Sequence, residues 1–312
     1  MPTNLKSKAV KAVGYRFDEL NSEAKERVQS RLWEMEMEYQ DWYESVIEMF
    51  AKDLEEWGIA IDTRPVELRS GKIRHDPEVY FDVSLMKSRA WAAFGAYIPD
   101  LRKTFESLSA TDFMSDELNA EWQAAGRRLL EKHGPLLDEL AAAGIEAAAR
   151  IVDTEHYWSG HKMSVESDIL DDIVAHTEYL WEDEEAADMT AVNDMAMTVY
   201  RMAANADGKI AGDPTGFREI NRGFDLVRLA IAEAYAVRRR AEQERLEKLA
   251  DNMLADTLEI VQQMAGHCAG MLAEEEEWLG SEEHARDWAD ANDVWFTAEG
   301  HTLFDYEPEG GE

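Results

Sequence analysis

The chain has 312 residues, of which 45% are apolar and 10% aromatic, so it can bury a sizeable core and is not a disordered acidic segment. It carries 66 Asp and Glu against 32 Lys and Arg, and the formal net charge of −34 repels nucleic acid and anionic membranes but attracts basic protein surfaces. We therefore expect no direct binding to nucleic acid and no membrane association. A simpler interpretation stays open, in which the charge only keeps a helical protein soluble.

The cysteine content and the N-terminal residues bear on the compartment. The single cysteine, Cys268, cannot form an intramolecular disulfide, and apolar neighbours at helical spacing predict a core position for it. Residues 1–14 are basic but lack the apolar run of a signal sequence, and no segment has the roughly eighteen consecutive apolar residues of a membrane span. These features predict a soluble protein that works in the cytoplasm.

The first long periodic segment, residues 15–57, predicts one amphipathic helix with a capped start at Asn21 or Ser22, after a turn in which Phe17 and Leu20 also pack. Its apolar side chains recur at steps of four and three and so share one stripe: Val28, Leu32, Met35, Tyr39, Trp42, Val46 and Met49. Acidic residues occupy the opposite face. Gly58 is suited to end the helix, because glycine readily adopts the left-handed conformation found at helix C-termini.

After Gly58 the pattern changes to the alternation of strands. Residues 59–61 and 79–83 predict strands of a small antiparallel sheet, with a connection between them. Residues 90–98 predict the partner strand, although a buried turn of helix is an alternative. Segments 151–158 and 163–169 flank Ser159-Gly160 and predict a hairpin. A sheet of about four or five strands would then pack against the first helix.

The rest of the chain predicts mostly helices, at 99–109, 115–132, 136–143, 173–204, 217–278 and 281–291. A break is expected at His133-Gly134-Pro135, and a final strand pair near 294–304. The fold class is α+β and predominantly helical, with long amphipathic helices packed on a small antiparallel sheet. We divide the chain into a basic N-terminal arm (1–14), an α+β core (15–172), a helical region (173–306) and an acidic tail (307–312).

Several segments carry a resemblance, namely YRFDELNSEAKERV, PEVYFDVS with AAFGAYI, EHYWSGHKMSVESDI, and EEEEWLGSEEHARDWADANDVWFTAEGHTLF. In this order they resemble a family of small uncharacterised proteins encoded by bacteriophages, some of which are labelled antitoxin-like. The resemblance implies an α+β fold, a phage origin and an accessory role, and it transfers no catalytic residue. The family usually has a glycine-rich turn where this chain has residues 81–89, so a ligand held by that turn would be lost here.

The acidic face of the first helix is the leading candidate for a partner-binding surface. Its residues are Glu34, Glu38, Asp41, Glu44, Glu48 and Glu55. Together with 182–185 and 274–277 they could imitate the charges of a nucleic acid backbone and occupy a basic surface of a host protein. Three tryptophans, Trp33, Trp42 and Trp57, exceed what one helix face needs, and we therefore expect a homo-oligomer.

A second candidate site lies on the predicted hairpin, where aromatic and histidine side chains could hold a nucleotide: His156, Tyr157, Trp158 and His161. The histidine spacing matches no zinc signature, and packing at the sheet edge is the simpler alternative. The sequence has no phosphate-binding glycine loop, no nucleophile elbow and no zinc helix. We therefore assign no catalytic residue, no metal and no cofactor.

These observations lead to two hypotheses of different classes. The first is a phage-encoded, non-enzymatic binding protein that inhibits a host factor, foremost a component of antiviral defence, through an acidic helical surface in the host cytoplasm. The alternative is a protein that sequesters or degrades a small nucleotide signal at the hairpin. A structural or virion role also fits the sequence.

Overall fold

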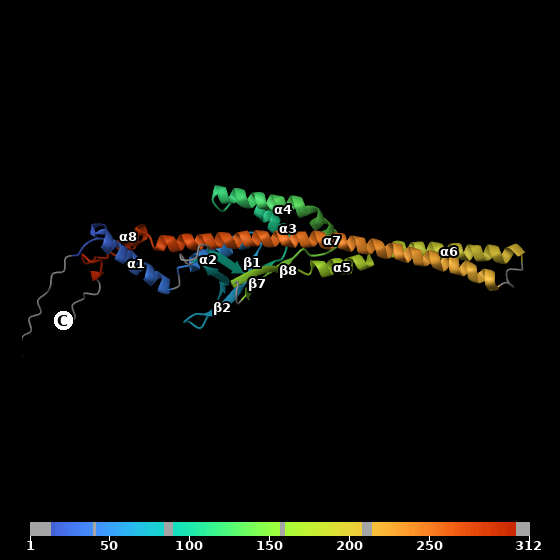
Figure 1. The fold of residues 1–312 in the computed structure, drawn as a ribbon, viewed down its shortest axis with the longest axis horizontal. Coiled ribbons are helices and arrows are strands. Elements are labelled where there is room, and N and C mark those ends of the chain that lie inside the picture. The colour runs from blue at the N-terminus through green and yellow to red at the C-terminus, as the bar shows by residue number, and fades with distance from the viewer. Residues whose placement is uncertain (1–13, 40–41, 84–89, 157–159, 208–213, 304–312) are drawn as a thin grey trace, which may run out of the picture.

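The spine of the molecule is a single helix, α7 (Pro214–Leu279), whose 66 residues extend about 99 Å. A computed structural model describes residues 14–39, 42–83, 90–156, 160–207 and 214–303. Three parts are arranged along α7: a terminal module at one end, an α+β body in the middle and a two-helix arm at the other end (Figure 1). The predicted helix at 217–278 is confirmed, and the later part of it buries an apolar seam that includes Leu246, Met253, Ile260 and Met264.

The body contains a four-stranded antiparallel sheet in the order β1-β6-β7-β8. Its strands are β1 (Ala60–Ile61), β6 (Ala96–Ile98), β7 (Ala149–His156) and β8 (Gly160–Glu166). A separate ladder joins β4 (Val79–Asp82) to β5 (Trp91–Phe94). The predicted hairpin is confirmed, and residues 90–98 are extended as expected, although they form two strands, β5 and β6, in different sheets. The fold is α+β and predominantly helical, as predicted.

The prediction of one long first helix is wrong. The segment forms a short 3-10 turn, η1 (Phe17–Glu19), and two separate helices, α1 (Ser22–Tyr39) and α2 (Glu44–Glu56). Each helix buries its own part of the predicted stripe in a different core: Val28 and Leu32 of α1 pack in the terminal module, whereas Val46 of α2 packs in the body. Gly58 ends α2 at a φ of +79°, as predicted.

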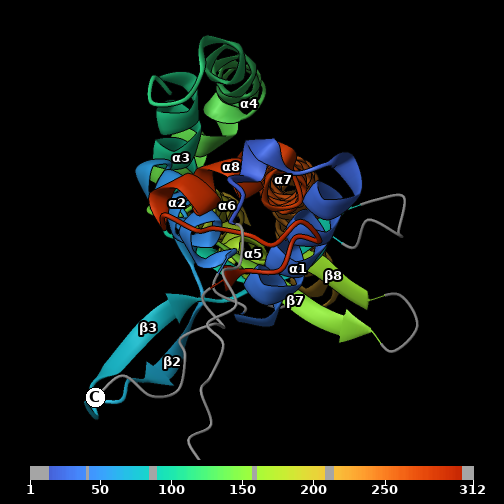
Figure 2. The ribbon, with the colours of Figure 1, turned by 90° about the vertical axis from the view of Figure 1, so that its left-hand side faces the viewer.

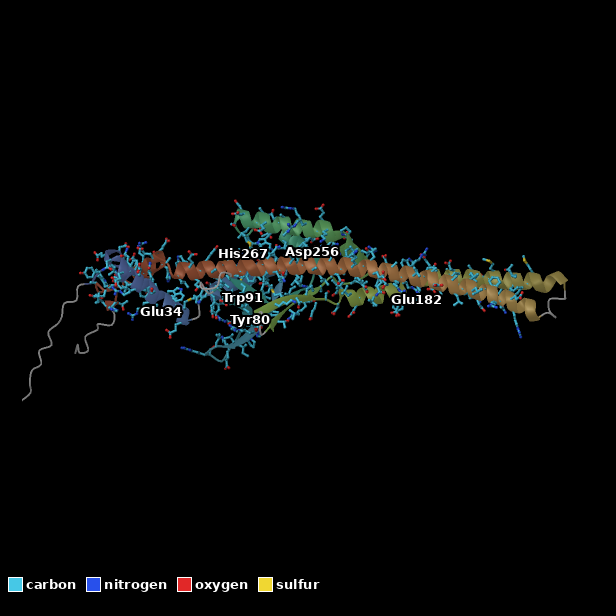
Figure 3. All side chains as sticks on the ribbon, viewed as in Figure 1. Glu34, Tyr80, Trp91, Glu182, Asp256 and His267 are labelled. Carbon is cyan, nitrogen blue, oxygen red and sulfur yellow. The ribbon has the colours of Figure 1, made fainter. Side chains whose placement is uncertain are left out.

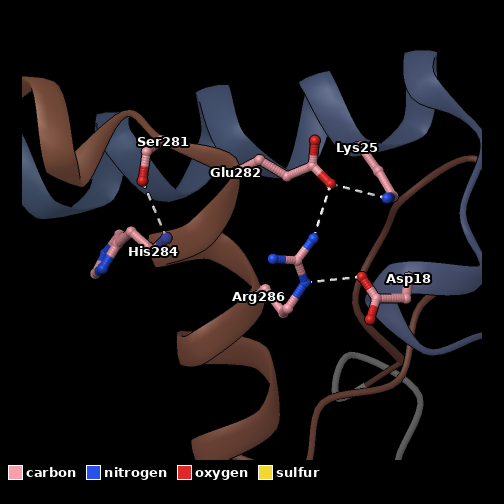
Figure 4. Close-up of polar contacts among 6 residues, drawn as sticks. All are labelled: Asp18, Lys25, Ser281, Glu282, His284 and Arg286. Carbon is pink, nitrogen blue, oxygen red and sulfur yellow. Dashed lines mark hydrogen bonds and ion pairs between the residues drawn. The ribbon is translucent and has the colours of Figure 1, made fainter.

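The terminal module joins the two ends of the described chain. Its core consists of Phe17, Leu20, Ala24, Val28, Leu32, Ala285, Ala289, Val294 and Phe296. The last helix, α8 (Glu282–Ala291), begins after Ser281, whose hydroxyl accepts a 3.0 Å hydrogen bond from the His284 backbone. Figure 4 shows Glu282 between Lys25 and Arg286, with Arg286 also reaching Asp18. The strand pair predicted near 294–304 is present only as a single antiparallel bridge, Phe296 to Thr302, and Phe296 also bridges to Tyr15.

The body also contains α3 (Leu101–Ser109), α4 (Asp116–Ala142) and α5 (Ile169–Tyr179). Helices α3 and α4 lie above α7 in Figure 1, whereas α5 lies below it, beside β8. The expected break at His133-Gly134-Pro135 is absent, because α4 runs through Pro135. Packing overrides the local penalty of the proline: His133, Leu136 and Leu137 are all buried, and His133 Nε2 lies 2.7 Å from Asp256 Oδ2 of α7.

The expected connection between the first strands is a hairpin, β2 (Thr63–Glu67) with β3 (Ile73–Pro77). It projects from the body (Figure 2) and is almost entirely exposed. Because neither strand has a buried face, the sequence lacks the apolar alternation by which strands are normally detected. Gly71, with a φ of +74°, closes its turn.

The arm consists of α6 (Glu182–Asp207) packed against the first part of α7. The helix expected at 173–204 is interrupted between α5 and α6 at Trp181, whose φ is +63°. No helix among the described residues is both long enough and apolar enough to cross a membrane. Of the predicted N-terminal arm only Gly14 is described, and the acidic tail lies outside the described residues.

Candidate functional site: an acidic apolar groove

The acidic residues predicted to bind a partner do not belong to one helix. Glu34 and Glu38 are exposed on α1, Glu48 and Glu55 are exposed on α2, and Asp41 lies outside the described residues. Glu44 is half-buried and forms a 3.5 Å ion pair with Arg74 of β3. Figure 3 shows Glu34 in the terminal module and Glu182 at the start of the arm, so acidic side chains are spread along the whole molecule.

The three tryptophans from which we predicted self-association have partners within the chain. Trp57 is fully buried, and its indole nitrogen donates a 2.8 Å hydrogen bond to the Thr111 hydroxyl. Trp42 packs edge-on against Phe81, with ring centroids 6.1 Å apart, and Trp33 is half-buried. These side chains therefore give no reason to place an oligomer interface at the first helices.

Of the predicted hairpin site, the structure describes the side chain of His161 alone; Tyr157, Trp158 and the side chain of His156 lie outside the described part. The His161 ring stacks on Tyr80, with centroids 4.2 Å apart, and on Trp91 at 5.5 Å. Its Nδ1 lies 2.6 Å from Asp153 Oδ2. The imidazole is thus fixed by strands β4, β5 and β7, a set of contacts that the sequence did not predict.

A polar pocket of about 220 Å³ lies beside His161. Asp62 and Arg150 form an ion pair of 2.7 Å at its edge, and the Tyr80 hydroxyl donates to Glu78, which raises the pKa of Tyr80. Asp153 is buried, and its Oδ1 has no hydrogen-bond partner among the described residues. One buried acceptor therefore remains for a small ligand with a hydrogen-bond donor.

A groove of about 730 Å³ lies between α2, the start of α4 and α7. Helix α2 contributes one stripe at steps of three and four, consisting of Val46, Met49, Asp53 and Glu56. Helix α7 contributes a facing stripe, His267, Met271, Glu274 and Trp278, with Glu275 beside it. Phe113, Met114 and Leu118 close the third side. Three large apolar side chains, Met49, Phe113 and Trp278, are between 43% and 51% exposed there, which is unusual outside binding surfaces.

The charge of the groove is predominantly negative. Four carboxylates line it, Asp53, Glu56, Glu274 and Glu275, against one lysine, Lys52. Burial raises the pKa of Asp53, while the nearby His267 and Lys52 act in the opposite direction. A carboxylate that has lost part of its hydration gains more from an arriving cation than one in open water. The groove therefore combines an apolar floor with an acidic rim, and this combination suits a ligand that is both apolar and basic.

Two observations on the described residues concern metal binding and the cysteine. No group of three or more His, Cys, Asp or Glu in the described ranges is placed to hold a metal ion. Cys268 is fully buried, as predicted, and burial raises the pKa of its thiol to about 12, so a thiolate nucleophile does not form there at neutral pH.

No family model, curated protein or solved structure matches the chain in the comparisons made with them. The site must therefore be interpreted from its own geometry. The sequence did contain one signal for the groove: two acids at helical spacing, Asp53 and Glu56, within the stripe of α2 that begins with Val46 and Met49. The contribution of α7, more than 200 positions later, has no local signal.

Proposed function

We propose that this chain is a non-enzymatic binding protein that takes a basic amphipathic helix of a partner protein into the groove between α2, α4 and α7. The observation that carries the proposal is the exposed apolar floor inside an acidic rim. The stripe from Val46 to Glu56 is about 15 Å long, which matches roughly three turns of a bound helix. Methionines at the floor, Met49 and Met271, suit a surface that adapts to its ligand.

The resemblance to bacteriophage proteins extends this proposal to a host partner. A phage protein that holds a basic helix of a host factor would inhibit that factor, and a component of antiviral defence is the partner class we favour. An apolar floor favours a helix over pure imitation of nucleic acid, because a nucleic acid mimic needs charge at regular spacing and no hydrophobic anchor.

The test uses a fluorescent synthetic peptide of Lys, Leu and Trp, about four turns long, whose order makes an amphipathic helix. A scrambled peptide of the same composition keeps the charge and removes the apolar face. We expect fluorescence anisotropy to show binding of the first peptide at least roughly tenfold tighter than the second. Equal binding of the two peptides would mean that the protein offers only its charge, and the groove proposal would fail.

Two variants with the same charge change locate the binding surface. The groove variant combines Glu56→Lys, Glu274→Lys and Glu275→Lys, and the matched control combines Glu34→Lys, Glu38→Lys and Glu48→Lys. We expect roughly tenfold weaker binding for the groove variant and a much smaller loss for the control. The reverse result would assign binding to the acidic surface predicted from the sequence. Affinity capture from nuclease-treated host lysate at low and high salt would then identify the natural partner.

The pocket beside His161 supports a second candidate function, capture of a small nucleotide. The specific observation in its favour is the buried and unpartnered Oδ1 of Asp153. Calorimetric titration with a panel of nucleotides tests it, since Trp158→Ala with His161→Ala should abolish nucleotide binding and leave peptide binding intact. If no nucleotide in the panel gives a heat of binding, this second candidate function is excluded.

A further inference from the structure

The groove between α2, α4 and α7 has a fixed order of side chains along its length, because α2 and α7 pass each other in opposite directions. One series of contacts marks the C-terminal end of α2. The ring centroid of Trp57 lies 5.3 Å from that of Trp122, which in turn lies 6.4 Å from that of His267 on α7. Burial raises the pKa of Asp53, and the nearby His267 is the largest influence in the opposite direction. The end of α2 that carries Asp53 is therefore beside His267.

The N-terminal end of α2 lies beside a later part of α7. The rings of Tyr43, the residue before α2, and Phe81 of β4 have centroids 5.0 Å apart. The next residue of that strand, Asp82, is close to Glu276 of α7: burial raises the pKa of Glu276, and the charge of Asp82 raises it further. Residues early in α2 are thus level with residues late in α7, and the two helices are antiparallel along the groove.

Equal steps along the two helices then place side chains opposite one another. Starting from Asp53 and His267, four residues back along α2 lead to Met49, and four residues forward along α7 lead to Met271. Both steps advance about 6 Å in the same direction. Glu274 follows three residues after Met271, about 10 Å from His267 along the axis of α7. The groove thus has acids towards both ends and methionines between them.

The acids of the groove form two pairs. The α2 acid pair is Asp53 with Glu56, and the α7 acid pair is Glu274 with Glu275. None of these four carboxylates forms an ion pair with another described residue. Lys52, which also lines the groove, adjoins Asp53 and offsets part of the charge of the α2 acid pair. The α7 acid pair therefore keeps more of its charge for a ligand.

We propose that the partner helix of this groove carries two basic residues seven positions apart, with apolar residues at the third and fourth positions between them. The inference rests on the proposed function of the groove and specifies the sequence pattern of its ligand. Seven residues are two turns of an α-helix, so the two cations return to one face about 10 Å apart. This is the separation of Asp53 from Glu274 along the groove. The apolar residues between the cations then lie on Met49 and Met271.

Other spacings of the two basic residues fit this arrangement less well. Basic residues four positions apart are separated by about 6 Å, so one of them lies over the methionines, where a cation loses hydration without gaining a carboxylate. Basic residues fourteen positions apart are separated by about 21 Å, which exceeds the length of about 15 Å from Val46 to Glu56. One cation then lies outside the groove.

The first test uses three fluorescent helical peptides of identical composition that share one apolar stripe. Their two lysines are four, seven or fourteen residues apart on one helix face, at about 6, 10 and 21 Å. We expect fluorescence anisotropy to show the seven-residue peptide bound at least roughly fivefold tighter than the other two. Equal binding of all three would overturn this inference and leave the groove proposal standing. If none binds tighter than a scrambled peptide, the proposed function fails as well.

Neutral variants show whether the two acid pairs set the spacing. Each of three double variants removes two negative charges, from the α2 acid pair, from the α7 acid pair, or from exposed positions of α1 as the matched control: Asp53→Asn with Glu56→Gln, Glu274→Gln with Glu275→Gln, and Glu34→Gln with Glu38→Gln. Circular dichroism confirms that each variant is folded.

We expect either acid-pair variant to reduce the preference for the seven-residue peptide to less than about twofold, because one cation of the peptide then has no carboxylate to meet. The loss of affinity should be larger for the α7 acid pair, since Lys52 already offsets part of the α2 acid pair. The control should keep the full preference. A preference that survives in either acid-pair variant, or that disappears in the control, would overturn the proposal.

Discussion

Three consecutive glutamates near the end of α7 have different surroundings. Glu274 and Glu275 line the groove, whereas Glu276 is turned inward and is only 4% exposed. Its Oε2 has no hydrogen-bond partner among the described residues. Burial raises the pKa of Glu276, and the charge of Asp82 acts in the same direction. At neutral pH the folded protein therefore holds a poorly solvated carboxylate, which costs stability.

We expect Glu276→Gln to increase the free energy of unfolding at pH 7 by about 1 kcal/mol. Because the folded pKa is raised, the folded state of the parent protein binds a proton more readily than the unfolded state, and its penalty disappears as the pH falls through that raised value. Urea denaturation should therefore give a difference between the two proteins at pH 7 that shrinks toward pH 4.

Glu277→Gln is the matched control for this prediction, since Glu277 is the exposed neighbour on the same helix. It should leave stability within about 0.5 kcal/mol of the parent protein at both pH values. If Glu276→Gln destabilises the protein at pH 7, an unseen donor satisfies the carboxylate and the burial argument is wrong.

At the scale of elements, the crossing of α3 and α4 depends on the absence of a side chain at Gly126. A Cβ there would lie 2.3 Å from the Ser109 backbone nitrogen and 2.8 Å from the Phe105 carbonyl oxygen. Alanine is ordinarily better than glycine inside a helix by about 1 kcal/mol. Here the two backbones would have to separate, so we expect Gly126→Ala to lower the free energy of unfolding by about 2 kcal/mol.

Gly266→Ala gives the opposite expectation in the same experiment. Gly266 is exposed inside α7, and a Cβ there meets nothing within 4 Å. The substitution should raise the free energy of unfolding by up to about 1 kcal/mol, measured as a higher urea midpoint. The two glycine-to-alanine substitutions are expected to change the free energy of unfolding in opposite directions, which separates the effect of helix propensity from that of packing. If Gly126→Ala stabilises the protein, α3 and α4 are not in backbone contact.

Where the sequence predicted elements correctly, the signal was local. The alternation of Val79, Phe81 and Val83 indicated β4, and the apolar seam from Leu246 to Cys268 indicated the later part of α7. Ser281 marked the start of α8 because its side chain caps the helix within three residues. Such features depend on neighbours in the chain, so a single sequence contains them.

Where prediction failed, the cause was a contact between distant residues. The stripe from Val28 to Met49 keeps helical spacing across the boundary between α1 and α2, so periodicity alone predicts one helix. It does not reveal that α1 packs on α8 in a separate core. Pro135 stays inside α4 because His133 reaches Asp256 of α7. The groove could not be predicted for the same reason. Its acids on α2 form a pattern in the sequence, but its apolar floor comes from three separate elements.

At the scale of the whole molecule, the net charge of −34 opposes folding into one compact state. Surface ion pairs work in the other direction, but each contributes only about 0 to 1 kcal/mol, and 66 acids far outnumber the bases available to pair with them. Repulsion among the acids should therefore dominate the response of stability to salt.

We expect the free energy of unfolding of the protein at pH 7 to rise with salt. The measurement uses urea, which is uncharged, and KCl from about 0.01 M to about 1 M, over which the Debye length falls from about 30 Å to about 3 Å. The gain should amount to a few kcal/mol, because screening relieves repulsion over a long acidic surface. Near pH 4.5, where the sequence has no net charge, the same salt should have little effect or should destabilise slightly by weakening ion pairs. A fall in stability with salt at pH 7 would mean that attractive pairs outweigh the excess of acids. The acidic surface would then be organised by internal pairing, and less of it would be free to attract a basic partner.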